Sequence, residues 1–278
     1  MNWFSRFIRS PESACTPVPD QVRECLPVRR RPAEARPRYL FTDPSIRIAA
    51  VGDIHGRLDL LRGLAGRLDE LAADASKRLV EVYVGDYVDR AGDAKGVIDF
   101  LLRRSALPDR DLVFLMGNHE QMLLSALEND RDFLFWLESG GNMTLLSYGV
   151  SPADAGRNPQ AKRMAFREAL PASHLEFLNR LAPSYARGGF YFSHAGVRPG
   201  TPLEEQKTKD LLWIRNRFLS SNAYFGAIVV HGHTPVRTVQ FKMNRIAIDT
   251  GAYFSGNLTC VLITDGSVGL LDGSMSPT

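Results

Sequence analysis

Five short apolar segments, each followed by a turn that carries Asp, Asn or His, constrain the fold of this chain more than any other feature. The segments cover residues 46–51, 79–84, 111–116, 190–192 and 227–230. They are rich in β-branched and aromatic residues, which is the pattern of buried strands. A single Gly-Asp or Asn-His pair would indicate an ordinary turn. Five such turns, each after a buried strand, instead predict loops that meet at one site.

The stretches between these segments complete an α/β pattern. Residues 58–74 and 96–104 have apolar positions at helical spacing and are predicted to be crossover helices between strands. Further strands are expected at residues 236–241, 245–249, 258–264 and 267–271, and we expect these to complete a second sheet. The fold class is therefore α/β, a two-sheet β-sandwich flanked by helices. Ligand sites in such folds lie beyond the C-terminal ends of the strands.

The polar side chains after the strands have the chemistry of a metal site. Carboxylate and amide oxygens suit hard divalent ions, imidazole suits first-row metals, and no cysteine takes part, so Mn, Fe or Zn is expected. The candidate ligands are Asp53, His55, Asp86, Asn118, His194 and His233.

Two ions are expected rather than one. Asp86, at the end of a central strand, is the natural bridge between ions about 3.5–4 Å apart. Asp53 and His55 would share one ion, and the remaining three ligands would hold the other. A water molecule shared by both ions would lose a proton near neutral pH, and the bridging hydroxide would be the nucleophile.

These motifs, in this order, resemble the PPP family of metal-dependent protein serine/threonine phosphatases. The resemblance is to the compact bacterial and bacteriophage branch typified by lambda phosphatase, within the calcineurin-like metallophosphoesterases. It extends from about Arg47 to about Thr264, with supporting stretches at residues 117–122, 212–217, 248–253 and 256–259. It implies the calcineurin-like fold, and its metal ligands fall on the six residues already selected by chemistry.

The resemblance also implies a general acid and two phosphate-binding residues. The acid falls on His119, with Asp89 as the partner that holds and charges the imidazole, and the arginines fall on Arg90 and Arg215. A serine alkoxide is a poor leaving group, and a positioned imidazolium accelerates such proton transfer about 10²–10⁴-fold. Arginine offers phosphate a planar, bidentate set of donors.

Two positions depart from the family pattern. Met116 stands where the phage-type pattern has Arg before Gly-Asn-His-Glu, so one substrate contact is expected to be missing or supplied elsewhere. Ala91 stands where the second motif normally has Gly after Asp-Arg. Ala91 would be strained if that position requires a positive φ.

Three other side chains have simpler interpretations. His231 is expected to pack beside the site rather than bind an ion, because the family match gives the ligand to His233. His174 begins a predicted helix and is expected to be exposed. Tyr253 is expected to approach the metal site.

The chain divides into a tail and one catalytic domain. Residues 1–44 are rich in Pro and Arg and lack apolar periodicity, so we expect a disordered tail. Residues 45–278 are expected to form the catalytic domain, with residues 121–181 as a helical insertion near the active site, where substrate selection should lie.

Composition sets milder limits. A net charge of +3 is too small to indicate a nucleic-acid partner. The three cysteines have no metal-binding or redox spacing, and their odd number favours a reducing, cytoplasmic environment. No apolar run is long enough for a signal sequence or a transmembrane helix.

The sequence thus predicts a phosphomonoester hydrolase that acts on phosphoserine and phosphothreonine in proteins or peptides, with two divalent ions, preferably Mn²⁺. The alternative is a symmetrical bis(5′-nucleosyl)-tetraphosphatase, whose relatives share the fold and the metal ligands. Asp89, Glu120 and Thr234 followed by Pro235 favour the first hypothesis. A third hypothesis, a binding module without metals, conflicts with the complete ligand set and His119.

Overall fold

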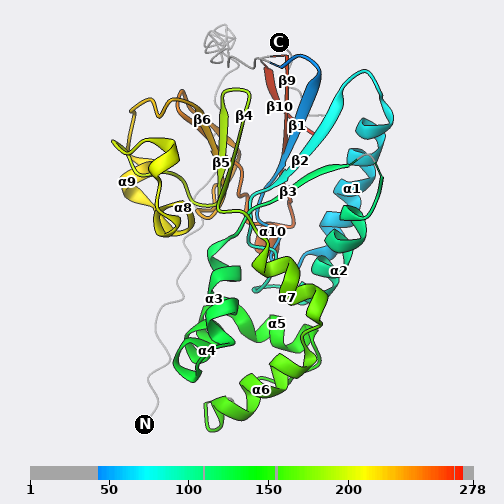
Figure 1. The fold of residues 1–278 in the computed structure, drawn as a ribbon, viewed down its shortest axis with the longest axis vertical. Coiled ribbons are helices and arrows are strands. Elements are labelled where there is room, and N and C mark those ends of the chain that lie inside the picture. The colour runs from blue at the N-terminus through cyan, green and yellow to red at the C-terminus, as the bar shows by residue number, and fades with distance from the viewer. Residues whose placement is uncertain (1–42, 109, 154–155, 266, 272–278) are drawn as a thin grey trace, which may run out of the picture. The chain divides into compact units, whose positions relative to one another are not determined.

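A computed structural model of the chain describes residues 43–108, 110–153, 156–265 and 267–271. The tail predicted over residues 1–44 therefore lies outside the described residues, apart from residues 43 and 44. The described part contains two five-stranded sheets, with strand orders β10-β9-β1-β2-β3 and β4-β5-β6-β8-β7 (Figure 1). The predicted fold class, two sheets flanked by helices, is confirmed.

The first sheet is built around three parallel strands. These are β1 (Ile46–Val51), β2 (Arg78–Tyr83) and β3 (Asp111–Phe114). On the other side of β1, β9 (Cys260–Thr264) pairs antiparallel with β1, and β10 (Ser267–Leu270) pairs antiparallel with β9. The expectation that these last two strands complete the second sheet is wrong. Apolar alternation defines which faces of a strand are buried, and it does not define which sheet edge the strand joins.

The second sheet also has a parallel centre. Strands β5 (Phe190–Ser193), β6 (Ile228–His231) and β8 (Arg245–Ala247) run parallel to one another, and the short β7 (Gln240–Phe241) pairs antiparallel with β8. Strand β4 (Ser184–Arg187) was not predicted. It forms a hairpin with β5 through Gly188 and Gly189, which both have positive φ, as a tight two-residue turn requires.

The two sheets pack face to face. Ile46, Ile48 and Ala50 alternate along β1 and lie in one apolar cluster with residues of the second sheet such as Phe192 and Val230. Residues of opposite parity on β1, such as Val51, belong to the cluster beneath the helices. Each central strand of the first sheet is therefore buried on both faces, which explains its continuous apolar run.

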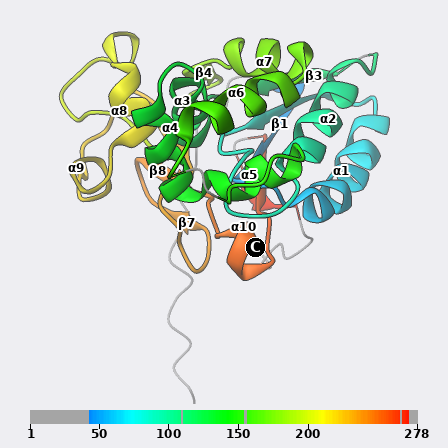
Figure 2. The ribbon, with the colours of Figure 1, turned by 90° about the horizontal axis from the view of Figure 1, so that it is seen from below.

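Helices cover the outer face of each sheet. Helices α1 (Leu58–Ala73) and α2 (Ala94–Ser105) lie beside the first sheet, and the short α8 (Thr208–Trp213) and α9 (Asn216–Leu219) lie beside the second (Figures 1 and 2). Leu61, Leu64 and Leu68 of α1 recur at helical spacing and are buried. None of the helices in the described ranges is long and apolar enough to cross a bilayer.

The segment between β3 and β4 is helical. It lies at the end of the sheets where the parallel strands terminate, and Figure 2 views the molecule from that side. Its elements are α3 (Asn118–Ala126), α4 (Asp130–Trp136), the π-helical turn η1 (Leu137–Gly141), α5 (Asn142–Ser147), α6 (Pro159–Ala169) and α7 (Ala172–Asn179). Two short helices, the 3₁₀ turn η2 (Leu203–Glu205) and α10 (Ala252–Ser255), lie in later loops.

His174 corrects one expectation. It begins α7, as predicted, but it is buried rather than exposed. Its Nδ1 lies 2.8 Å from the Tyr148 hydroxyl, and its Nε2 lies 2.9 Å from Asp99 Oδ1. The first turn of α7 packs against α2 and the end of α5, so a polar side chain on that face needs these partners to be buried.

Candidate metal centre

The loops that follow the parallel strands of both sheets converge on one group of polar side chains. The loops after β1, β2 and β3 belong to the first sheet, and those after β5, β6 and β8 belong to the second. Because parallel strands end at the same edge, both sheets deliver residues to their common end. The six candidate ligands and the His119–Asp89 pair are all buried there.

Asp86 stands between two sets of donor atoms. Its Oδ2 lies 3.4 Å from His55 Nε2, and its Oδ1 lies 3.4 Å from His194 Nε2. Asn118 Oδ1 lies 2.9 Å from His194 Nε2 and 2.7 Å from His233 Nδ1. One carboxylate thus faces two groups, as a bridge between two ions would.

Donor atoms in each set lie within 4.8 Å of one another. One set contains His55, Asp86 and His119, and the other contains Asp86, His194 and His233. Asp53 lies beside His233 of the second set. Its Oδ2 accepts the His233 backbone N–H at 2.9 Å, and its Oδ1 is buried without a hydrogen-bond partner among the described residues.

The donor set fits divalent cations. His55 and His194 turn Nδ1 toward the backbone carbonyls of Val88 and Val84, at 2.8 and 3.0 Å, which leaves Nε2 of each ring for an ion. Burial lowers the pKa of His55 to about 4, so the ring is neutral, as a metal ligand must be. Burial, followed by the charges of Asp249 and Asp86, raises the pKa of Asp53 well above its usual range. Cations would offset this concentration of buried carboxylates.

Unusual backbone geometry marks the same loops. Among the described non-glycine residues, six have positive φ, and five of these belong to the predicted site: His55, Asp86, Asp89, Arg90 and His233. Such conformations cost roughly 1–3 kcal/mol each and persist only where the surroundings enforce them. Ala91 is not among the six, so its replacement of the usual glycine causes no strain of this kind.

Glu120, which the sequence marked only as favouring the phosphatase hypothesis, helps to enforce this backbone geometry. Its carboxylate accepts the backbone N–H groups of Asp86, Tyr87, Val88 and Gly117 at 2.7–3.2 Å. It is the third residue of α3, a position where an acidic side chain commonly reaches back to free N–H groups. An acidic residue at that helix position was the sequence feature that could have revealed this role.

His119 lies against Asp89. The two are joined by a 2.7 Å contact between His119 Nδ1 and Asp89 Oδ2. Burial alone would lower the pKa of His119, but the carboxylates of Asp86 and Asp89 outweigh it, and the net effect raises the pKa above its ordinary value. Our sequence reading did not identify the other two partners of Asp89, Trp136 and Thr144.

Two arginines face this region from exposed positions. Arg90 Nη2 lies 3.4 Å from His119 Nε2, and the Arg90 guanidinium lies 5.4 Å from the centre of the Tyr253 ring. Arg215 is exposed. Burial, with a smaller contribution from the charge of Arg215, lowers the pKa of His194.

The remaining predicted residues occupy less central places. Tyr253 approaches the site, as predicted, with its ring centre 5.3 Å from that of His55. His231 is buried and packs at 5.0 Å against the Phe218 ring, outside both donor sets. Met116 is half-buried, and its backbone N–H bonds to Ala182.

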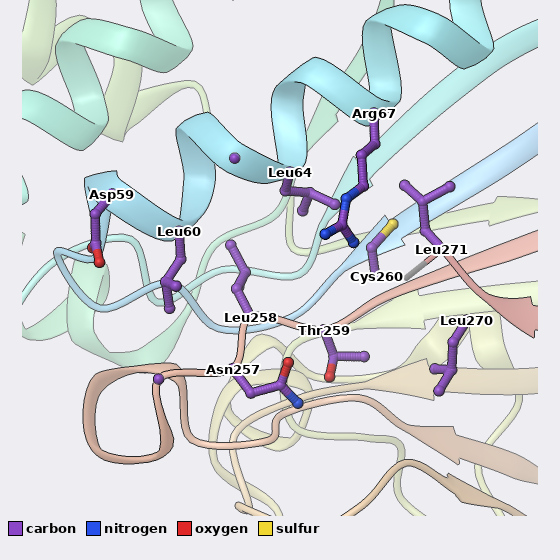
Figure 3. Close-up of a pocket in the computed structure, with 12 residues that line it drawn as sticks. Asp59, Leu60, Leu64, Arg67, Asn257, Leu258, Thr259, Cys260, Leu270 and Leu271 are labelled. Atoms are coloured by element: carbon purple, nitrogen blue, oxygen red, sulfur yellow. The ribbon is translucent and has the colours of Figure 1, made fainter. Parts of the chain in front are cut away.

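A separate pocket of about 290 Å³ lies between α1 and the segment that leads into β9 (Figure 3). It is lined by leucines together with Asp59, Arg67, Asn257 and Thr259. None of the predicted ligands or phosphate-binding residues lines it, so the pocket is distinct from the candidate centre.

Sequence comparisons connect this geometry with known proteins. Serine/threonine-protein phosphatase 1 of Salmonella typhimurium is 31% identical over 223 residues, which cover 77% of this chain and 90% of the relative. Serine/threonine-protein phosphatase 2 of Escherichia coli is 28% identical over 221 residues, covering 76% and 90%. An asymmetrical bis(5′-nucleosyl)-tetraphosphatase of Anoxybacillus flavithermus is 25% identical over 233 residues, covering 76% and 88%.

Solved structures support the fold. A putative diadenosine tetraphosphatase superposes with a TM-score of 0.56 at 19% identity, covering 82% of this chain and 94% of the other. A mutant cold-active protein tyrosine phosphatase gives a TM-score of 0.55 at 18% identity, covering 82% and 79%.

The family comparison is decisive. Residues 46–262, which include all ten predicted site residues, match the calcineurin-like phosphoesterase family. The chain therefore belongs to the calcineurin-like phosphoesterases and is an enzyme of the metallophosphoesterase class, whose members act through a dinuclear metal centre.

Proposed function

We propose that this protein hydrolyses phosphoserine and phosphothreonine in proteins. The observation that carries the proposal is the buried His119–Asp89 pair, which lies beside the two donor sets that share Asp86. The names of the relatives from Salmonella and Escherichia coli support the same substrate class. We assign the ions, preferably Mn²⁺, to Asp53, His55, Asp86, Asn118, His194 and His233.

When bound, the ions supply an activated water and offset the charge of the phosphoryl group. The chain supplies the proton for the leaving group. Asp89 holds Nδ1 of His119, so Nε2 is the atom that delivers a proton to the serine or threonine oxygen. The Asp89 carboxylate at Nδ1 favours the protonated ring that this step needs.

Arg90 and Arg215 are assigned to the phosphate. Arg90 lies near His119 Nε2, so its fork can hold phosphate oxygens while the leaving oxygen lies at the imidazole. The Tyr253 ring faces the Arg90 guanidinium and orients it. Arg215 adds positive charge from the side of His194 and His233.

Hydrolysis of dinucleoside polyphosphates is the second candidate. The relative from Anoxybacillus flavithermus carries this activity in its name, in the asymmetrical form rather than the symmetrical form of the alternative hypothesis. A nucleoside phosphate is a far better leaving group than an alkoxide and needs little proton donation. The buried contact between His119 and Asp89 therefore favours hydrolysis of phosphomonoesters as the function.

The test is a substrate panel on the purified protein. Metal is removed with a chelator and restored as Mn²⁺, Zn²⁺ or Fe²⁺, and turnover is measured on peptides with phosphoserine, phosphothreonine or phosphotyrosine and on diadenosine tetraphosphate. We expect the phosphoserine and phosphothreonine peptides to have the highest kcat/KM, with Mn²⁺. A higher value for diadenosine tetraphosphate would reject the proposal.

The same proposal places the protein in the cytoplasm with phosphoproteins as its partners. Three cysteines without a pairing pattern favour a reducing compartment. Fractionation of cells that express the full chain would test this location, and recovery from a membrane or secreted fraction would contradict it.

A further inference from the structure

Asp89 and Arg90 are held in a conformation that they would not adopt alone. Their φ angles are 68° and 69°, in the left-handed region. Two consecutive non-glycine residues in that region require contacts that enforce the geometry. The helical segment between β3 and β4 provides such contacts.

Every polar atom that Asp89 offers there has a partner. The indole Nε1 of Trp136 lies 2.9 and 3.1 Å from the two carboxylate oxygens. The Thr144 hydroxyl donates to Oδ1 at 2.6 Å and accepts the Asp89 backbone N–H at 2.9 Å. With His119 on Oδ2, three donors converge on a fully buried carboxylate.

The backbone of η1, which is kinked at Gly140, completes the arrangement. The Gly140 carbonyl accepts the Arg90 N–H at 3.3 Å, and Gly140 has a φ of 119°, which favours glycine. A Cβ at Gly141 would overlap the indole of Trp136. The Gly140-Gly141 pair therefore lets the chain kink between α4 and α5 while the indole lies against Asp89.

We propose that Trp136 and Thr144 are positioning residues that aim Asp89 at His119, so that the helical insertion determines how efficiently the leaving group receives its proton. This inference rests on the general-acid role given to His119 in the proposed function. Neither residue touches a candidate metal-ligand atom in the contacts described, so their effect on metal content should be small.

Thr144 allows the cleanest test. Thr144→Val keeps the shape and removes the hydroxyl, whereas Thr144→Ser keeps the hydroxyl. Activity is compared on two substrates. Phosphoserine peptide is an alkyl phosphomonoester, and p-nitrophenyl phosphate is an aryl ester. We expect Thr144→Val to lower kcat for the alkyl ester about tenfold and for the aryl ester less than about threefold, because only the alkoxide needs the acid. Thr144→Ser should restore the wild-type ratio.

Trp136→Phe removes the second donor and should shift the ratio in the same direction. Tyr148→Phe is the matched control. It deletes a buried hydroxyl from the same helical segment, but its partner is His174 rather than Asp89. This control should leave the alkyl-to-aryl ratio unchanged even if stability falls.

A double-mutant cycle tests whether Thr144 acts through the acid. In a His119→Asn background, Thr144→Val should cause no further loss on the alkyl ester. A further loss of similar size, or equal losses on both esters in the wild-type background, would overturn the positioning role and leave Thr144 a structural residue.

A spectroscopic readout separates failure of this inference from failure of the proposed function. In zinc-loaded protein, the His119 Nδ1–H proton resonance should shift in Thr144→Val and Trp136→Phe and stay in place in Tyr148→Phe. If His119→Asn slows both esters equally, the general-acid role fails, and the resonance still decides whether the two residues position Asp89. An unmoved resonance overturns the positioning proposal.

Discussion

At the scale of single residues, one carboxylate is central to the candidate site. Asp86 is the only residue shared by the two donor sets found in the described ranges. Burial would raise its pKa, but the surrounding histidines outweigh burial and lower it. Asp86 therefore remains charged, and its two oxygens face different groups.

Replacing Asp86 with Asn should remove metal and activity together. The amide keeps an oxygen that can accept the backbone N–H of His119, which donates to Asp86 Oδ1 at 3.1 Å, so the fold should survive. It loses the charge that compensates two cations, and we expect metal affinity to fall by more than the roughly 10–100-fold that follows loss of a residue bonded only to a ligand. Metal analysis after dialysis, with circular dichroism as the folding control, measures this. A folded variant with wild-type turnover would exclude a bridging role.

Replacing Arg90 with Lys keeps the charge but removes the planar fork. We expect kcat/KM to fall about tenfold on phosphopeptides with no change in metal content, because Lys cannot hold two phosphate oxygens in one plane. Arg180→Lys, at the exposed residue that follows α7, is a matched control. Equal kinetics for the two variants would remove Arg90 from the site.

At the scale of elements, the local sequence predicts where strands and helices form better than it predicts which other elements they contact. Strand β1 occupies residues 46–51 as predicted, because an apolar run that ends in Gly-Asp has few other interpretations. The edges joined by β9 and β10, and the contacts of Trp136 with Asp89, depend on pairs far apart in the chain. The candidate ligands could be selected from the sequence because each follows a predicted strand, with Asp53 and His55 both following β1. Trp136 and Thr144 have no such marker in the sequence.

The π-helical turn η1 offers a stability prediction for an element. Gly141→Ala should lower the free energy of unfolding by about 1–3 kcal/mol, because the added methyl group overlaps the buried Trp136 indole. Gly66→Ala is the opposite case. Gly66 lies exposed inside α1, where nothing stands within 4 Å of an added Cβ, and alanine should stabilise the helix by about 1 kcal/mol. Denaturant unfolding of both variants compares them, and a neutral Gly141→Ala would contradict the packing argument.

At the scale of the whole molecule, buried histidines make stability depend on pH. Burial lowers the pKa of His231 from its ordinary value of 6.5 to about 3. Above pH 6.5 the ring is neutral in both the folded and the unfolded state, so it adds nothing to the pH dependence of stability. As pH falls below 6.5 the unfolded chain takes up the proton first, so the free energy of unfolding decreases until the pH reaches the folded-state pKa.

His231→Phe isolates this contribution. Between pH 6.5 and 5, the free energy of unfolding should decrease by ~2 kcal/mol less in the variant than in the wild type. One pH unit corresponds to about 1.4 kcal/mol for one proton. Comparing slopes rather than absolute values removes any packing difference against Phe218. Denaturant unfolding at several pH values measures it, and parallel slopes would mean that His231 is protonated while folded.

The convergence of loops from both sheets also has a consequence during synthesis. A ribosome that has completed residue 190 has made His55, Asp86 and Asn118, but neither His194 nor His233. Pairing between distant strands is slow, because the intervening chain must first be ordered. A chain that ends at residue 190 contains every residue of the first donor set, and the second set must wait for β5 and β6. Each molecule can therefore become catalytically active only late in its synthesis, after most of its core residues have been made.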